Sequence, residues 1–344
     1  MIKNIAVVEW RHSIGISQNI HVSLLELGYN AVLFDPAKNI PQETQLIFSY
    51  GPYGNLINIF HKKQSIPPDI RPLLIHWDTE GMPNYLLPKW FVCSAGKLRS
   101  WFGSIGEYNQ GLAELKTYQF LNSKACRYRY FGDYQYGYSH KYLDQFIEYS
   151  LIYTQAHRRF GIPAEYVPWG TSKNEWQTLN LDRDIDILWM GKCRSKSRAD
   201  QVQKIYEAVT KAGYKMLIVD GVHHPYIFGN QRTEILNRSK ITLNLLPAWD
   251  FNNFPFRFHL AAPNRSLVIS DILFPHNPEY KPGFHYVSAP REQLPEIIIY
   301  YLQHVSEREE IVDQAFHLTV NEMTMTQSVR KILALIKNDN WHEG

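Results

Sequence analysis

Short runs of β-branched and aliphatic residues alternate with amphipathic segments, and this pattern constrains the fold more than any other feature of the sequence. Ile5–Glu9 and Ala31–Phe34 enclose a helical pattern that runs from Gln18 to Leu27 and ends at Gly28. Alternation of this kind predicts parallel strands joined by helices that cover the faces of a sheet. We therefore expect an α/β fold.

The same alternation starts again in the second half of the chain. Asp186–Met190 reads as a strand, a basic loop follows it, and Ala199–Ala212 has the spacing of an amphipathic helix. The polar stretch Lys173–Arg183 has no apolar period and is interpreted as a connection. The chain is thus predicted to form two facing doubly wound, Rossmann-like domains. Their expected bounds are 1–172 and 184–322, with a C-terminal helix in 323–344.

Three segments give less regular patterns. Trp101–Tyr142 shows no clear period and contains the Tyr-rich stretch Tyr128–Tyr142. Leu151–Thr154 is rich in strand-forming residues and is interpreted as a strand. Pro247–His259 is interpreted as an aromatic loop that forms the wall of a pocket, because it holds one Trp and four Phe.

Composition excludes several classes of protein. The 344 residues are 44% hydrophobic and 20% charged, as in globular proteins, and the net charge of +3 is too small to imply nucleic acid. The three cysteines are widely spaced, which favours a reducing compartment. The start lacks the apolar run of about 7–15 residues that a signal peptide needs. We expect a cytoplasmic protein without a transmembrane segment, and peripheral contact with a membrane stays open.

Cations gather directly after the predicted strand Asp186–Met190. The loop Gly191–Arg198 holds four of them in seven residues. Ligands of parallel sheets bind at the carboxyl ends of strands, and Lys, Arg and helix N-termini suit a phosphate or diphosphate. A solvated basic loop is the alternative. The sequence has neither a P-loop nor a G-x-G-x-x-G after the first strand, so it does not support P-loop ATP hydrolysis or a nicotinamide dehydrogenase.

Three segments in order resemble the donor-binding half of GT-B glycosyltransferases, and most closely the bacterial family-1-like and spore-maturation-type enzymes. They are DILWMGKCRSK, ILNRSKITLNLLP and RFHLAAPNRSLVISD. The resemblance implies the GT-B architecture, with the last helix crossing back to the first domain. Two family features are absent, since Leu260 stands where the family has a donor-binding Glu, and Asn252 stands at the acidic position eight residues earlier.

The resemblance implies transfer of a sugar from a nucleoside diphosphate donor to an unknown acceptor, which is a glycan, a lipid, a protein or a small molecule. Fixed cations would stabilise the diphosphate leaving group without a metal, so no metal and no cofactor beyond the nucleotide sugar is expected. The alternatives are a sugar-nucleotide epimerase of the same fold and a non-catalytic module that binds a nucleotide sugar or a glycan. Leu260 motivates the second of these. Nucleic acid is not an expected partner.

The resemblance and the strand-end positions together define the expected site. The candidate catalytic residues on the acceptor side, as general bases or as ligands of acceptor hydroxyls, are His12, Asp78 and Glu80. The expected donor-binding residues are Gly15, Lys192, Arg194, Lys196, Asp220, Gly221, Tyr226, Arg257, His259, Asn264, Arg265 and Ser266. For Tyr226, ordinary packing is an equal alternative. The Tyr-rich stretch is considered as a stacking surface for sugar rings or as an oligomer surface.

Overall fold

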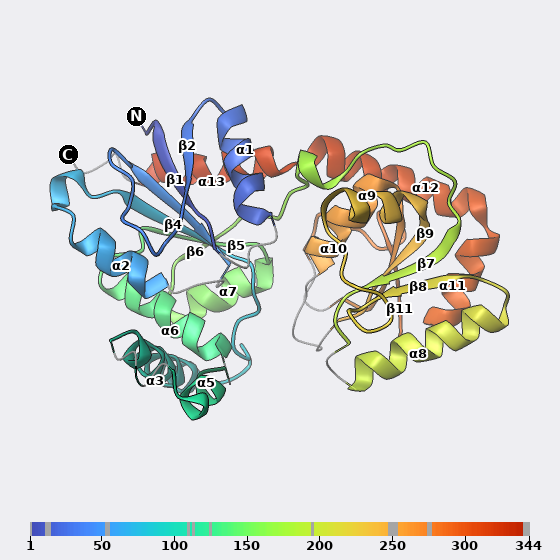
Figure 1. Cartoon of the computed structure of the whole chain (residues 1–344), viewed down its shortest axis with the longest axis horizontal. Coiled ribbons are helices and arrows are strands. Elements are labelled where there is room, and N and C mark those ends of the chain that lie inside the picture. Colours follow the sequence, from blue (N-terminus) through green and yellow to red (C-terminus); the bar gives the residue numbers. More distant parts are fainter. Residues whose placement is uncertain are drawn as a thin grey trace. The chain divides into compact units, whose positions relative to one another are not determined.

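The computed structural model describes residues 2–10, 15–51, 56–108, 111, 114–123, 126–193, 196–246, 254–273 and 277–339. The chain divides into two compact units. The first unit comprises Met1–Pro168 and Val329–Gly344, and the second comprises Trp169–Ser328. Each unit is built on a parallel sheet flanked by helices (Figure 1), which confirms the predicted α/β class.

The first unit contains a parallel sheet with the strand order β2-β1-β3-β4-β5-β6. Helix α1 covers one face, whereas α2, α6 and α7 cover the other (Figure 1). Its elements are β1 (Asn4–Val8), α1 (Ile16–Glu26), β2 (Asn30–Phe34), β3 (Leu46–Tyr50), α2 (Leu56–Gln64), η1 (Pro68–Ile70), β4 (Leu73–Asp78), α3 (Lys89–Tyr108), α5 (Lys116–Ser123), α6 (Cys126–Ser139), β5 (Gln145–Glu148), α7 (Leu151–Phe160) and β6 (Ala164–Tyr166), together with most of α13 (Met325–Asp339).

The second unit contains a parallel sheet with the strand order β11-β10-β9-β7-β8. Its elements are η2 (Lys173–Glu175), β7 (Ile185–Met190), α8 (Lys196–Lys211), β8 (Met216–Val219), α9 (Gly229–Arg238), β9 (Ser239–Asn244), α10 (Phe254–Ala261), η3 (Ala262–Asn264), β10 (Leu267–Asp271), β11 (Val287–Ala289), α11 (Leu294–Gln303), α12 (Val305–His317) and η4 (Leu318–Glu322). No helix in the described part of the chain is both long enough and apolar enough to cross a bilayer.

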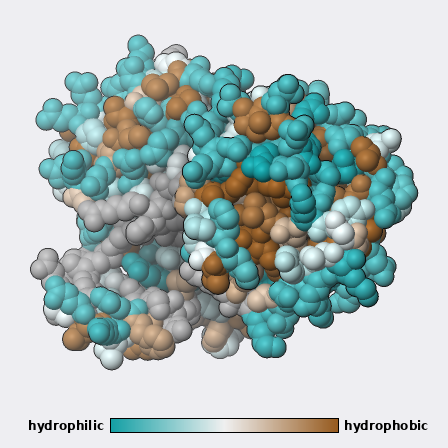
Figure 2. All heavy atoms as spheres, turned by 45° about the vertical axis from the view of Figure 1, so that its right-hand side comes forward, coloured by the Kyte–Doolittle hydropathy of each residue, from teal (hydrophilic) through white to brown (hydrophobic). Residues whose placement is uncertain are grey.

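The central strands are apolar on both faces because helices cover both sides of each sheet. In β7, Ile187 and Trp189 belong to a core that includes side chains of α8 and α11, whereas Leu188 belongs to a core that includes side chains of α9 and α10. This alternation follows from the two-residue period of a strand. On the face drawn in Figure 2, hydrophobic residues gather in the middle of the second unit inside a rim of hydrophilic ones.

The structure corrects the interpretation of Leu151–Thr154 as a strand. These residues open helix α7, and the strand that pairs with β4 is Gln145–Glu148 instead. Local strand propensity is misleading here because Tyr153, Ala156 and Phe160 recur with helical spacing on the buried side. Gly161, in the left-handed conformation with φ 94°, ends the helix.

Two segments interpreted as irregular are also largely helical. Most of Tyr128–Tyr142 lies in α6, although Tyr and Gly are poor helix formers, because Phe131 and Tyr134 on this helix are buried and tertiary packing overrides propensity. The second half of Pro247–His259 lies in α10. Its first residues fall outside the described part of the chain.

Candidate functional site

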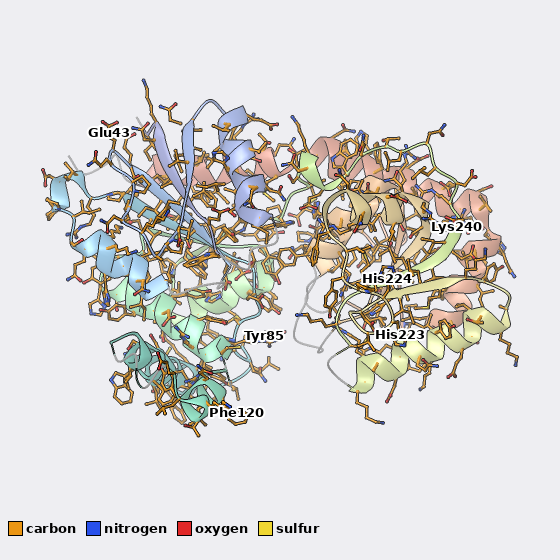
Figure 3. All side chains as sticks on the ribbon, in the orientation of Figure 1. Glu43, Tyr85, Phe120, His223, His224 and Lys240 are labelled. Atoms are coloured by element: carbon orange, nitrogen blue, oxygen red, sulfur yellow. The ribbon has the colours of Figure 1, made fainter. Side chains whose placement is uncertain are left out.

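The carboxyl ends of the strands in the second unit bring several predicted donor residues to one edge of the sheet. Gly191 and Lys192 follow β7, and Asp220 and Gly221 follow β8. Figure 3 shows His223 and His224 on the loop after β8, whereas Lys240, near the start of β9, lies toward the opposite edge. The carboxyl edge is where parallel sheets bind ligands.

Arg257 reaches this edge from α10. Its Nε donates to the carbonyl oxygen of Met190 at 3.1 Å, and its Nη1 donates to Oδ1 of Asn244 at 3.0 Å. The guanidinium lies over the ring of Trp189, 4.8 Å from the centroid. Loss of hydration, reinforced by the charge of Arg198, lowers its pKa to about 9, so the group stays charged at neutral pH.

Gly191 makes this placement of Arg257 sterically feasible. Its φ of 154° is strained for any other residue, and a Cβ at this position would lie 2.4 Å from Nη2 of Arg257. The backbone N–H of Gly191 donates to the carbonyl oxygen of Val219 at 3.0 Å, which holds the strand end in place. The absence of a side chain at Gly191 therefore leaves room for the guanidinium of Arg257. The sequence alone did not reveal this role of Gly191.

Further cations line the same edge. Arg198, which is buried, donates to two backbone carbonyl oxygens at 2.7 and 3.1 Å, and Arg291 forms an ion pair with Asp271 at 2.8 Å. Arg257 has no carboxylate among its described hydrogen-bond partners. We name Lys192, Arg198, Arg257 and Arg291 the cationic edge. Its surplus of positive charge suits an anionic ligand such as a diphosphate.

The loop after β8 adds an aromatic ring to the cationic edge. The Nζ of Lys192 lies 5.8 Å from the centroid of the Tyr226 ring, and Tyr226 packs against Gly221, where a Cβ would lie 2.7 Å from the ring. The carboxylate of Asp220 instead holds its own loop, since it accepts two backbone N–H bonds at 2.8 Å and contacts the ring of His223 at 2.9 Å. The structure thus brings Lys192, Gly221 and Tyr226 together.

Lys196 and His259 are placed differently. Lys196 begins α8 with a side chain that is 92% exposed, and it pairs with Asp200 on the same helix at 3.3 Å. His259 is buried, with its ring nitrogens 2.5 Å from Thr171 Oγ1 and 2.8 Å from the Tyr280 hydroxyl. Burial lowers the pKa of His259 to about 3. These contacts describe a neutral core histidine.

Asn264, Arg265 and Ser266 lie at the opposite edge of the sheet, because they precede β10 rather than follow it. Arg265, with φ 59°, pairs with Asp313 at 2.5 Å. The hydroxyl of Ser266 hydrogen-bonds that of Thr242 at 2.7 Å. The structure does not bring these three residues together with the cationic edge.

A second cluster of functional groups lies at the carboxyl edge of the first sheet. Asp78 ends β4 and Glu148 ends β5, and the two are register partners. The Nε2 of His157, on α7, lies 3.5 Å from Glu148 Oε2 and 3.9 Å from Asp78 Oδ2. Tyr134 donates to Asp78 Oδ1 at 3.2 Å. We name Asp78, Glu148 and His157 the carboxyl cluster, and all three are buried.

Burial controls the protonation of the carboxyl cluster. It raises the pKa of Asp78 to about 8, and burial together with the nearby Asp78 raises that of Glu148 well above its ordinary value. Burial, with a smaller effect of His76, lowers the pKa of His157 to about 3. At neutral pH the carboxyls therefore retain protons and the imidazole is neutral. This arrangement can donate and share protons without a net buried charge.

The carboxyl cluster also has the donor set of a metal site. One ligand atom from each residue lies within 4.8 Å of the other two. A His and two carboxylates suit a divalent transition metal. Because such ligands must be deprotonated, binding would displace the carboxyl protons and would strengthen as pH rises.

Four predicted site residues remain: Glu80 and His12 from the acceptor side, and Gly15 and Arg194 from the donor-binding set. Glu80 follows β4, is partly exposed, and has a pKa raised by burial and opposed by Arg127. Gly15 caps α1 in the left-handed conformation with φ 76°. His12 and Arg194 lie outside the described residues, so both stay predictions.

Sequence reasoning missed four of these groups, namely Glu148, His157, Asp271 and Arg291. Asp271 and Glu148 could have been identified from the sequence, because each is an acidic residue at the last position of a strand. Glu148 was overlooked because the strand was placed at Leu151–Thr154. His157 and Arg291 follow from tertiary packing, which no spacing in the sequence indicates.

Comparison with known proteins defines the class. Residues 197–334 match the model of a family described as "Glycosyl transferase-like". The structure is similar to HepE from Anabaena, solved with UDP and glucose, with a TM-score of 0.57 and 8% identity over 97% of this chain and 99% of that chain. AviGT4, a glycosyltransferase involved in avilamycin A biosynthesis, gives 0.56 and 11% over 97% of both chains. No curated protein sequence matches.

A third solved structure agrees with these two. Sucrose-phosphate synthase from Thermosynechococcus elongatus gives a TM-score of 0.55 and 11% identity over 97% of this chain and 98% of that chain. The fold is therefore that of the GT-B enzymes. The match to the glycosyl transferase-like model covers most of the second unit and agrees with the predicted resemblance to family-1-like glycosyltransferases.

Proposed function

We propose that this protein is a glycosyltransferase that uses a UDP-sugar as donor and binds the donor's diphosphate at the cationic edge. The observation that carries the proposal is Arg257, a charged and partly buried side chain that hydrogen-bonds neutral oxygens at a strand end. Uridine is proposed because HepE was solved with UDP and with UDP-glucose. In this proposal residues 184–322 form the donor side, residues 1–172 the acceptor side, and the helix in 323–344 returns to the first domain.

In the proposed reaction the protein must stabilise the departing diphosphate and accept the proton of the acceptor hydroxyl. An acceptor hydroxyl attacks the anomeric carbon, the bond from that carbon to the diphosphate breaks, and the hydroxyl proton passes to a base. Lys192, Arg257 and Arg291 stabilise the negative charge that develops on the departing diphosphate. A bound metal ion is then not needed for this stabilisation. Glu80 is proposed as the base for two reasons. Its side chain is more accessible to solvent than that of Asp78, and burial raises its pKa toward neutral pH. No cofactor beyond the donor is proposed.

The first test measures UDP binding by calorimetry and release of UDP from UDP-sugars. Removal of one charged hydrogen-bonding group costs about 1.5–3 kcal/mol, so Arg257→Ala is expected to weaken UDP binding by roughly 10–150-fold. Arg265→Ala is the matched control, since it removes an Arg from the opposite edge of the same sheet. Equal, small effects of the two variants, or no UDP binding by the parent protein, would overturn the proposal.

A second measurement addresses metal and acceptor. Transfer is expected to continue after treatment with a chelator, because the cationic edge replaces the metal. Activity lost on chelation and restored by Mn²⁺ would contradict metal independence and would direct attention to the carboxyl cluster. Conversion of the donor sugar without any acceptor would identify an epimerase instead.

A further inference from the structure

Helix α3 in the first unit presents an apolar stripe to solvent. Trp90, Leu98 and Trp101 are 71%, 62% and 61% exposed. At 3.6 residues per turn they fall within an arc of about 80° on one side of the helix. Exposed indoles are uncommon, and two on one helix face mark an interaction surface rather than scattered surface residues. We name these three residues the α3 stripe.

The other side of α3 is packed, so the direction of the stripe is fixed. Val92 is fully buried, and the hydroxyl of Ser100 donates to Asp133 of α6 at 2.5 Å. Helices α3 and α5 lie farther from the sheet than α6 does (Figure 1). The Tyr118 hydroxyl of α5 donates to the Phe102 carbonyl oxygen of α3 at 2.8 Å.

Helix α5 extends the apolar surface. Phe120 and Leu121 are 60% and 54% exposed, and Figure 3 shows Phe120 at the outer end of this helical layer. Both helices therefore expose large apolar side chains to solvent. No described helix can span a bilayer, so such a surface could only lie on one.

Charge points to the kind of partner. Residues 81–142, which join β4 to β5, contain eight Lys or Arg and three Asp or Glu, a net charge of +5. The rest of the chain contains 28 and 30, a net charge of −2. Lys89, Lys97 and Lys116 on α3 and α5 are exposed. The positive charge of the whole molecule is thus concentrated on the segment that carries the α3 stripe.

A cavity of about 490 Å³ borders the stripe. Lys97 and Trp101 of α3, His61 of α2, and Tyr136 and His140 near the end of α6 contribute to its lining. No carboxylate occurs among the described residues that line it. Basic and aromatic groups without an acid suit the phosphate of a lipid headgroup beside the apolar stripe.

We propose that α3 and α5 dock the protein on the surface of an anionic lipid bilayer. Trp, Phe and Leu would enter the boundary between headgroups and acyl chains, while the lysines contact anionic headgroups. A protein partner fits less well, because Lys is depleted from the cores of protein interfaces, whereas Lys97 lies between the two indoles of the stripe. The inference is independent of the donor proposed above.

The test is flotation of the full chain with vesicles of phosphatidylcholine alone or mixed in equal parts with phosphatidylglycerol. The parent protein is expected to float only with the mixed vesicles, and less at high salt. The double variant Trp90→Ser, Trp101→Ser is expected to lose about tenfold in partitioning. The charge variant Lys89→Glu, Lys97→Glu is expected to lose at least about tenfold, since each cation near such a surface contributes about fivefold.

Matched variants control for nonspecific effects. Ile70→Ser removes another exposed apolar side chain of the first unit, and Lys204→Glu with Lys211→Glu reverses two exposed charges on α8, so both are expected to float like the parent. Failure of the parent to float, or equal losses in the control variants, would overturn the proposal. A dimer in gel filtration that only the Trp variant dissociates, with flotation unchanged, would identify a second copy as the partner and would also overturn it. UDP release in solution, measured separately, is expected to survive in every variant.

Discussion

At the scale of single residues, the first unit contains a network of buried ionisable side chains. His76 and His157 have pKa values lowered to about 3 by burial, whereas the Asp78 pKa is raised to about 8. His76 lies 3.3 Å from the Tyr134 hydroxyl, which also contacts Asp78. All these groups are neutral at pH 7, so the network stays in the core without the cost of a buried charge. Each of them makes stability depend on pH.

The sign of that dependence differs between the two kinds of group. The folded protein holds the Asp78 proton between about pH 4 and 8 whereas the unfolded chain does not, so the free energy of unfolding falls as pH rises through this window. The histidines act oppositely, but only below their ordinary pKa of 6.5. Between about pH 6.5 and 8 only the buried carboxyls contribute to the pH dependence of the free energy of unfolding. Each of them contributes a slope of at most about 1.4 kcal/mol per pH unit.

We expect Asp78→Asn, which mimics the protonated acid, to reduce this slope. The measurement is denaturant unfolding of parent and variant at several pH values across the window from about 6.5 to 8. Asp69→Asn, at an exposed position, is the control and should keep the slope of the parent. Identical slopes in the parent and in Asp78→Asn would show that Asp78 is ionised in the folded protein.

At the scale of elements, helix α10 joins the core of the second unit to its site. Phe254, Phe258 and Ala261 are buried, and the ring of Phe258 lies 5.1 Å from that of Phe254. Arg257 projects from the same helix to the cationic edge. Leu260, at the position of the family Glu, packs partly buried against the core. The core residues of α10 therefore set the position of its functional residue.

Phe258→Ala is expected to destabilise the second unit by about 3–5 kcal/mol, the usual cost of deleting a fully buried Phe. UDP binding should weaken as well, because the cavity releases the helix that holds Arg257. Calorimetric unfolding and UDP titration measure the two effects. Phe284→Ala, at a half-exposed ring, is the control. Unfolding of Phe258→Ala at the parent temperature would refute this role of α10.

Some helices and strands could be predicted from the sequence and others could not. The strands that begin at Asn4, Asn30 and Ile185 were predicted to within one residue, because apolar runs bounded by polar residues identify buried parallel strands. Helix α6 and the first turn of α7 were missed because their Tyr and β-branched residues disfavour helices locally. Arg257 and Lys192 were predicted from strand-end position, whereas the carboxyl cluster depends on β5, which was misplaced.

At the scale of the whole molecule, the two units share one helix. Helix α13 begins at Met325 in the second unit, and from Val329 onward it belongs to the first. Val329, Ile332, Leu333 and Ile336 are all buried. Each such side chain contributes about 1.5–3 kcal/mol when fully buried. The segment from Val329 to Ile336 is therefore part of the core of the first unit.

A chain that stops after Ser328 is accordingly expected to lose stability in the first unit and not in the second. Hydrogen exchange should increase in the strands of the first sheet, while β7 and β9 keep their protection. Arg330→Ala with Lys331→Ala changes exposed positions of the same helix and should leave both sheets protected. Exchange that increases first in β7 and β9 would show that the helix stabilises the second unit instead. UDP binding by the truncated chain adds an independent readout, because the cationic edge lies wholly within the second unit and should retain it.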